Sequence, residues 1–161
     1  MSAQIQKGDI LRAITASLTA QLHETVAALQ EAQNGATNSE SRPENKYDTR
    51  ALETSYLAAA HTERAETLRR VMAHVHFWKP DSGMKVVAPG ALVELDGERV
   101  PQRVFLTPFP ASMTVQVDGL AIQVVTTAAP LAAALLGKQA GDVAAVRVAG
   151  VVNEVELVSV D

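Results

Sequence analysis

The residues best suited to chemistry lie in one polar segment, residues 36–50, where three carboxylates alternate with three basic side chains. The carboxylates are Glu40, Glu44 and Asp48, and the basic residues between and after them are Arg42, Lys46 and Arg50. Carboxylate oxygens are the ligands that Mg²⁺ and other hard cations prefer in proteins. We therefore interpret the three carboxylates as candidate metal ligands at an exposed turn.

The same segment also carries signals for the start of a helix. Ser41 and Glu44 have the spacing of a capping box, and Pro43 is tolerated in the first turn of a helix. Asp48 or Thr49 would instead cap a helix that begins later. Both interpretations stay open, because a capping carboxylate at an exposed turn can also bind a cation.

Few other residues have the types or spacing that catalysis needs. The chain has no cysteine, which excludes thiolate nucleophiles, disulfides and cysteine-based metal sites. His74 and His76 stand near each other, but lone histidines in polar surroundings are more often surface residues than ligands. Phosphate-binding glycine loops, nucleophile elbows and His-Glu-x-x-His pairs are absent from the sequence. We expect no catalytic centre in the second half of the chain and no metal site in the isolated protein.

The composition of the chain changes near its middle. Residues 1–75 hold 14 alanines and 3 valines, whereas residues 76–161 hold 17 valines, 7 glycines and 6 prolines. Alanine favours helices, valine favours strands, and glycine and proline favour turns. The predicted fold class is therefore α+β, with a helical domain at 1–76 and a sheet domain at 84–161.

Two long amphipathic helices are predicted in the first half. The first covers about residues 5–33 and ends at a glycine cap, Asn34-Gly35, and the second covers about residues 48–75. Their apolar stripes are Leu11, Ile14, Leu18, Leu22, Val26 and Leu29, then Leu52, Tyr56, Ala59, Ala60, Leu68, Val71 and Val75. Two such helices joined by a short polar segment favour an antiparallel, coiled-coil hairpin. Its tip is expected at about residues 34–48.

The second half is predicted to form a five- or six-stranded antiparallel sheet with one short helix. Strand patterns flank Asp96-Gly97, Asp118-Gly119 and Ala149-Gly150, which are typical hairpin turns. Residues 130–137 have a proline at the start and a glycine at the end, as a short helix does. Phe77-Trp78, just before the turn-rich linker at 79–83, are expected to anchor the helices onto the sheet.

Charge and hydropathy exclude two classes of partner. The net charge is −4 and neither half is basic, which argues against sequence-specific DNA binding, because phosphate neutralisation needs clustered lysine and arginine. No apolar run approaches the roughly 20 residues of a membrane helix, and the first residues lack a signal-peptide pattern. We expect a soluble, cytoplasmic monomer without membrane contact.

The order of these parts resembles the bacterial Gre family of transcript-cleavage factors, and the most specific match is residues 129–142. This segment, Ala-Pro-Leu-Ala-Ala-Ala-Leu-Leu-Gly-Lys-Gln-Ala-Gly-Asp, resembles the family's Ser-Pro-Leu-Gly-x-Ala-Leu-Leu-Gly-Lys-x-x-Gly-Asp. Alanine stands at 129 and 132 where the family has serine and glycine. The resemblance implies an FKBP-like C-terminal domain that docks on RNA polymerase at the rim of its secondary channel. The candidate docking residues, which also mark the fold, are Pro130, Leu131, Leu135, Gly137, Lys138 and Asp142.

The resemblance also implies a role for the hairpin tip. The family carries Asp-x-x-Glu-Asn there, and its carboxylates help to hold a second Mg²⁺ at the polymerase's own active site, where backtracked RNA is hydrolysed. Glu44-Asn45 match this pattern, but Ser41 stands where the family has aspartate. Asp48 and Glu40 are the nearby carboxylates that can substitute, and Asp48 is the better candidate. The protein is then an accessory factor and no enzyme, with Mg²⁺ shared with the polymerase, no cofactor of its own and only indirect contact with nascent RNA.

Three other functions stay open at this point. A non-cleaving regulator would occupy the same channel, and it differs from a cleavage factor only at the tip. An FKBP-like domain could instead bind peptides or isomerise proline, but such sites need several aromatic walls and this half offers only Phe77, Trp78, Phe105 and Phe109. The remaining alternative is an interaction domain for an unrelated partner.

Overall fold

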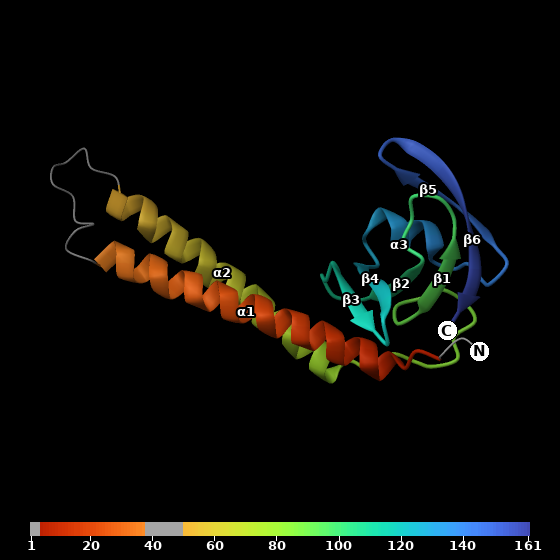
Figure 1. Cartoon of the computed structure of the whole chain (residues 1–161), viewed down its shortest axis with the longest axis horizontal. Helices are drawn as coiled ribbons and strands as arrows, with labels where there is room; N and C mark the ends of the chain where they lie inside the picture. The colour runs from red at the N-terminus through yellow and green to blue at the C-terminus, as the bar shows by residue number, and fades with distance from the viewer. Residues whose placement is uncertain (1–3, 38–49) are drawn as a thin grey trace. The chain divides into compact units, whose positions relative to one another are not determined.

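The computed structural model describes residues 4–37 and 50–161, and this part of the chain holds three helices and six strands (Figure 1). The helices are α1 (Lys7–Thr37), α2 (Arg50–Phe77) and α3 (Pro130–Leu135). The strands are β1 (Leu92–Asp96), β2 (Arg103–Thr107), β3 (Met113–Val117), β4 (Leu120–Thr126), β5 (Val143–Val148) and β6 (Val151–Val160). The predicted α+β fold, a helical hairpin followed by a sheet with one short helix, is confirmed.

Contacts divide the chain into two compact units. The sheet unit comprises Met1–Ile14 and His74–Asp161, and the hairpin unit comprises Thr15–Ala73. The first turns of α1 and the end of α2 thus belong to the sheet unit. The expected division into a helical domain at 1–76 and a sheet domain at 84–161 stays a prediction.

In the hairpin unit, α1 and α2 lie antiparallel and side by side (Figure 1). Arg64 Nη2 donates a hydrogen bond from α2 to Gln21 Oε1 on α1 at 3.1 Å. Every member of the predicted stripe of α1 is buried or half-buried, which confirms that stripe. The helices therefore pack through one narrow seam, as the periodicity of α1 predicts.

The predicted stripe of α2 is only partly right. Leu68, Val71 and Val75 are buried, but Leu52 and Tyr56 are 53% and 68% exposed. Ala59 and Ala60 are exposed as well. The half-buried positions in this part of α2 are Thr54, Ala58 and His61, which continue the three- and four-residue spacing of Leu68 backwards. Small and polar side chains, rather than the large apolar ones, thus form this end of the seam.

The predicted helix end at Asn34-Gly35 is wrong, because α1 continues to Thr37. A Cβ atom added to Gly35 would lie 3.1 Å from Cγ2 of Thr54 on α2. Gly35 therefore allows close approach of the two helices instead of supplying a left-handed cap. Glycine inside a helix costs about 1 kcal/mol relative to alanine, and the tight contact gives a reason for it here.

The sheet has the strand order β3-β4-β2-β1-β6-β5. Its neighbours are antiparallel except β2 and β4, which are parallel, with Phe105 opposite Val124. The expectation of a purely antiparallel sheet is thus wrong for this pair. After β2 the chain forms the edge strand β3 and then turns at Asp118-Gly119. β4 therefore lies between β3 and β2 and runs in the same direction as β2. Asp118 and Gly119 have φ values of 50° and 77°, as a two-residue hairpin turn requires.

The two faces of the sheet carry different side chains. On one face, α3 contributes Ala132 and Leu135 to a buried cluster that includes Val93 and Val104. On the other face, Trp78 packs against Phe105, with ring centroids 5.9 Å apart. The anchoring role expected for Trp78 fits this contact with the sheet, whereas Phe77 is 81% exposed and its expected anchoring role is wrong.

Lys7 lies in the first turn of α1, and among the described residues it is the one charged residue that is buried. Its Nζ donates a hydrogen bond to the main-chain oxygen of Asp81 at 2.5 Å. Burial lowers the pKa of Lys7 from its ordinary value, while the charges of Asp161 and Asp81 act to raise it. Lys7 thereby ties the start of α1 to the linker that leads into the sheet.

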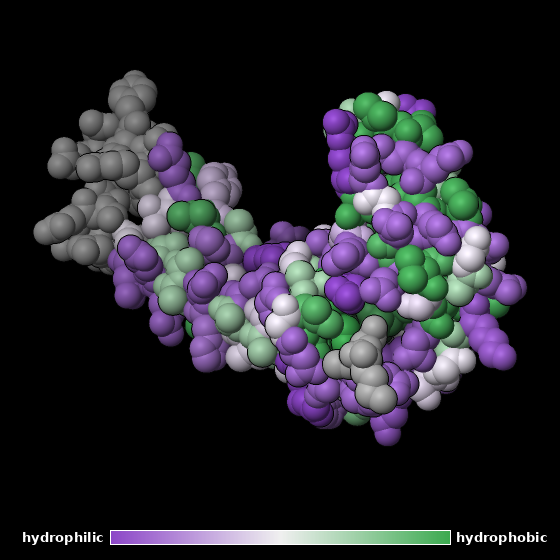
Figure 2. Space-filling view, turned by 45° about the vertical axis from the view of Figure 1, so that its right-hand side comes forward, coloured by the Kyte–Doolittle hydropathy of each residue, from purple (hydrophilic) through white to green (hydrophobic). Residues whose placement is uncertain are grey.

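The visible surface is mainly polar, with apolar residues scattered among the polar ones (Figure 2). Among the described residues, no helix combines the length and the hydropathy that crossing a membrane would need.

Candidate functional site

The candidate metal ligands Glu40, Glu44 and Asp48 lie outside the described residues, as do the candidate caps Ser41 and Thr49. Their roles at the tip stay predictions. The structure describes the helices on either side, α1 up to Thr37 and α2 from Arg50. The antiparallel helices therefore lead directly into the segment that carries the three carboxylates.

Within residues 4–37 and 50–161, no group of three or more His, Asp or Glu side chains is placed to hold a metal ion. His74 and His76 are both exposed near the end of α2. The ring of His76 packs edge-on against Phe77, with centroids 4.9 Å apart. The described part of the chain therefore offers no candidate metal site in addition to the proposed one at the tip.

The candidate docking segment begins with α3. Ala129, just before the helix, is extended, with φ −68° and ψ 145°, and gives no side-chain cap. Pro130 at the helix start needs no hydrogen-bond partner for its nitrogen and has a φ suited to a first turn. The predicted short helix is therefore confirmed: α3 ends at Leu135, and Gly137, the predicted stop, follows the C-cap residue Leu136.

After α3 the chain is held by main-chain hydrogen bonds to a neighbouring segment. Gly137 N donates to Val87 O at 2.9 Å, and Val87 N donates to Lys138 O at 2.8 Å. Gly137 has a φ of 80°, a left-handed conformation that favours glycine. Gly137 and the main chain of Lys138 thus connect the end of α3 to the segment at residues 86–87, where Val86 forms an isolated bridge.

A second turn precedes β5. Gly141 has a φ of 89°, and its N–H donates to Leu157 O at 2.7 Å. The Asp142 carboxylate accepts the N–H of Gln139 at 2.8 Å. Local structure therefore explains the glycine at 141 and the aspartate at 142 without any partner.

Burial separates the candidate docking residues into two groups. Leu135 is fully buried in the core beside the sheet, so its side chain is not available to a partner. Pro130, Gly137 and Asp142 are exposed, and Leu131 and Lys138 are half-buried. We define the α3 turn surface as Pro130, Lys138 and Asp142 from this set together with two exposed neighbours, Leu136 and Val86.

Leu136 and Val86 are additions that the sequence reasoning missed. They are 38% and 41% exposed, and Val86 pairs with Gln139 in an isolated bridge. Leu136 turns outward because it follows the last helical residue, with φ −53° and ψ 133°. The helix spacing from Ala132 predicts an inward direction for residue 136, so no signal in the sequence identifies it as exposed.

Comparisons with known proteins found similar solved structures, while no family model and no curated protein matches the chain. The chain is similar to GreA factor homolog 1 (Gfh1) of Thermus thermophilus, with 22% identity, coverage of 92% of this chain and 95% of that chain, and a TM-score of 0.39. For Gfh1 of Thermus aquaticus the identity is 23%, the coverages are 92% and 94%, and the TM-score is 0.37. A structure described as the transcription factor Gfh1 is 24% identical, with coverages of 92% and 93% and a TM-score of 0.38.

Proposed function

We propose that this protein is a Gre-like accessory factor that binds RNA polymerase at the secondary channel and regulates elongation. The observation that carries the proposal is the segment 129–142, which agrees with the Gre pattern at most of its defined positions. Local structure accounts for Leu135, Gly137, Gly141 and Asp142 as parts of a helix and two turns. The α3 turn surface is formed by exposed and half-buried residues of this segment together with Val86, and it is the proposed docking surface.

The hairpin supplies the part that enters the channel. In the hairpin unit α1 covers residues 15–37, which is 23 residues or about 35 Å at about 1.5 Å per residue. Two helices packed side by side are only about 20 Å across, since one helix with its side chains measures about 10 Å. A rod of these proportions suits a narrow channel, and the polymerase partner would place the protein in the cytoplasm.

The tip carboxylates are the proposed chemical end of the rod. Glu44 and Asp48, with Glu40 beside them in sequence, are proposed as accessory ligands for Mg²⁺ shared with the polymerase. Cleavage of backtracked RNA would then occur in the polymerase active site, so this protein itself is no enzyme. Ser41 removes one carboxylate from the family pattern, and Asp48 is the proposed replacement.

The test is RNA cleavage in a stalled, backtracked elongation complex with Mg²⁺ present. We expect the wild-type protein to shorten the transcript, and Glu44→Ala and Asp48→Ala to reduce the rate by about tenfold or more, as loss of a metal-supporting group does. Glu63→Ala, an exposed carboxylate farther along α2, is the matched control and should leave the rate unchanged.

The outcomes separate the remaining functions. A wild-type protein that binds the polymerase without shortening RNA would leave the non-cleaving channel regulator as the function. If the protein does not bind RNA polymerase, that result refutes the proposal as a whole.

The FKBP-like peptide-binding alternative is not favoured by the packing of the aromatic residues. Phe105 and Phe109 are buried, and Trp78 covers both, with centroid distances of 5.9 and 5.4 Å. Phe77 is exposed at the end of α2. These side chains therefore stack on one another instead of lining an open proline site.

A further inference from the structure

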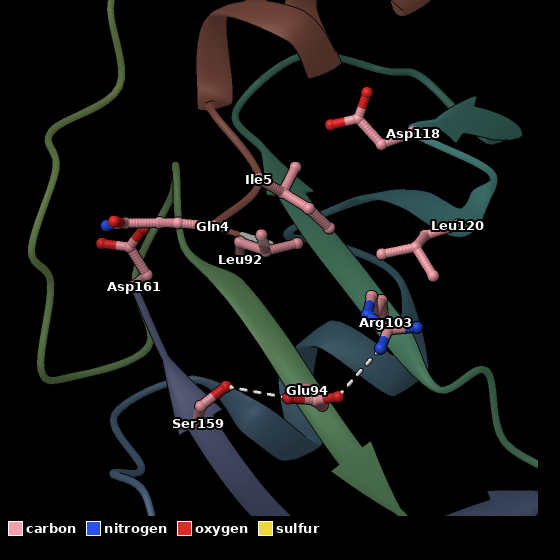
Figure 3. Close-up of a pocket in the computed structure, with 9 residues that line it drawn as sticks. All are labelled: Gln4, Ile5, Leu92, Glu94, Arg103, Asp118, Leu120, Ser159 and Asp161. Carbon is pink, nitrogen blue, oxygen red and sulfur yellow. Dashed lines mark hydrogen bonds and ion pairs between the residues drawn. The ribbon is translucent and has the colours of Figure 1, made fainter. Parts of the chain in front are cut away.

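A groove lies on the face of the sheet opposite α3, and Figure 3 shows its lining. Its volume is about 660 Å³, within the range of about 300–1,000 Å³ that is typical of ligand sites. The lining residues are Gln4, Ile5, Leu92, Glu94, Arg103, Asp118, Leu120, Ser159 and Asp161, all from the sheet unit. None of them belongs to the docking segment at 129–142.

The strand register fixes this face. Glu94 lies opposite Arg103 on β2 and opposite Ser159 on β6, so the three side chains share one face. Val93 and Val104, at the alternate positions, belong to the cluster packed by α3. Leu120, the first residue of β4, lines the groove, whereas the docking segment at 129–142 comes after Thr126, the last residue of β4. The groove is thus a surface separate from the proposed polymerase contact.

The groove combines an apolar wall with a satisfied ion pair. Ile5, Leu92 and Leu120 give the apolar surface. Arg103 Nη2 donates to Glu94 Oε1 at 3.0 Å, and Ser159 Oγ donates to Glu94 Oε2 at 3.5 Å (Figure 3). Glu94 therefore already balances the positive charge of Arg103.

Two further carboxylates leave the lining negative. Asp161 accepts the N–H of Gly83 at 2.7 Å, and the nearby charge of Lys7 interacts with it. Asp118, in the turn between β3 and β4, has neither a hydrogen bond nor an ion pair with any described residue. In Figure 3 it stands beside the groove near Leu120, and no dashed line reaches it. The uncompensated charge of the groove is therefore at Asp118.

We propose that this groove binds a segment of a partner protein that carries an arginine or lysine next to an apolar side chain. The apolar side chain covers Ile5, Leu92 and Leu120, and the basic group pairs with Asp118. The excess of carboxylates disfavours acidic peptides and nucleic-acid phosphates, so charge complementarity selects a basic partner. This surface adds a second contact to a protein whose proposed docking surface lies elsewhere.

The test uses the full chain, labelled with ¹⁵N, and short capped peptides as probes. We expect Ac-Leu-Arg-Ala-NH₂ to shift the amide resonances of residues 92–94, 103 and 118–120. The matched peptide Ac-Leu-Gln-Ala-NH₂ should bind about threefold to fivefold more weakly, since an exposed ion pair contributes at most a factor of about five. Ac-Leu-Glu-Ala-NH₂ should bind more weakly still.

Asp118→Asn is the decisive variant, because asparagine adopts the positive φ of this turn as readily as aspartate does. It should lower the affinity of the arginine peptide to that of the glutamine peptide. Asp96→Asn, an exposed carboxylate at the end of β1 outside the lining, is the control and should change nothing.

Three results would overturn the proposal: no shift at the groove, an arginine peptide that binds Asp118→Asn as tightly as wild type, or equal binding of the glutamate peptide. Groove resonances that shift with protein concentration alone would assign the groove to a second copy of the chain instead. No polymerase is present in this experiment, so its failure is independent of the proposed function.

Discussion

Leu135 and Leu136 are neighbours in the segment that resembles the Gre pattern, yet the structure gives them different environments. Leu135 is 0% exposed and Leu136 is 38% exposed. Replacing a fully buried leucine by alanine removes about three carbons, or about 2.4 kcal/mol at about 0.8 kcal/mol each, and the cavity left behind raises the loss to about 3–5 kcal/mol. For Leu136, about 2.4 kcal/mol multiplied by its buried fraction gives a loss of about 1.5 kcal/mol, and no cavity cost is added because solvent can fill the space. We predict that Leu135→Ala lowers the free energy of unfolding by at least about 1.5 kcal/mol more than Leu136→Ala does.

Urea unfolding followed by the fluorescence of Trp78 measures this difference. Trp78 is the chain's single tryptophan, and it packs on Phe105 in the sheet unit, so its signal reports that unit. Polymerase binding should show the reverse order: Leu136→Ala weakens binding, and Leu135→Ala keeps it at temperatures where the protein is folded. Equal losses of stability in the two variants would refute the assignment of Leu135 to the core. Unchanged binding by Leu136→Ala would remove Leu136 from the docking surface.

Three further predictions test local features. Gly137→Ala and Gly141→Ala should each cost about 1–2 kcal/mol in urea unfolding, because both glycines are left-handed while an added Cβ meets no atom within 4 Å; a neutral effect would contradict the conformation. Gly35→Ala should stabilise the hairpin more in a Thr54→Ser background, because that variant removes the methyl group that lies 3.1 Å from the added Cβ. We expect a coupling of about 0.5 kcal/mol or more in a double-mutant cycle, whereas additive effects would exclude the contact. Because burial lowers the pKa of Lys7, the unfolded chain binds more protons than the folded chain between that lowered pKa and 10.5. The free energy of unfolding should therefore rise with pH in this range, and Lys7→Met should lose this rise. Identical pH profiles of wild type and Lys7→Met from about pH 7 to 10.5 would contradict the prediction.

The helices show how far periodicity predicts packing. The stripe of α1 is predicted correctly because its large apolar residues recur with one phase, as Ile14 and Leu18 do. In α2 the large residues Leu52 and Tyr56 suggest a phase that the structure does not use. The seam there depends on a close approach at Gly35, which requires knowledge of both helices at once. A single-helix pattern therefore carries no signal for it.

The sheet shows a similar division. The dipeptide Asp118-Gly119 predicts its hairpin correctly, because positive φ values are typical of such a dipeptide. Asp96-Gly97 has no positive φ, and the hairpin of β1 and β2 closes through a longer loop. The parallel pairing of β2 with β4 is not predictable in this way, since it joins strands with another strand between them in sequence. The groove depends on the same long-range order, because Glu94, Arg103 and Ser159 come from three strands. In the docking segment the motif identifies the region, but only burial distinguishes Leu135 from Leu136.

The central claim, that the hairpin tip enters the secondary channel of RNA polymerase, is tested most directly by cross-linking. A photoreactive amino acid at Asn45, within the proposed tip, and another at Val152, exposed near the turn between β5 and β6, would be compared in backtracked elongation complexes that contain this protein. We predict that the Asn45 position cross-links to the 3′ end of the RNA and the Val152 position does not. Bound protein that gives no RNA cross-link from Asn45, or equal cross-links from both positions, would contradict the claim.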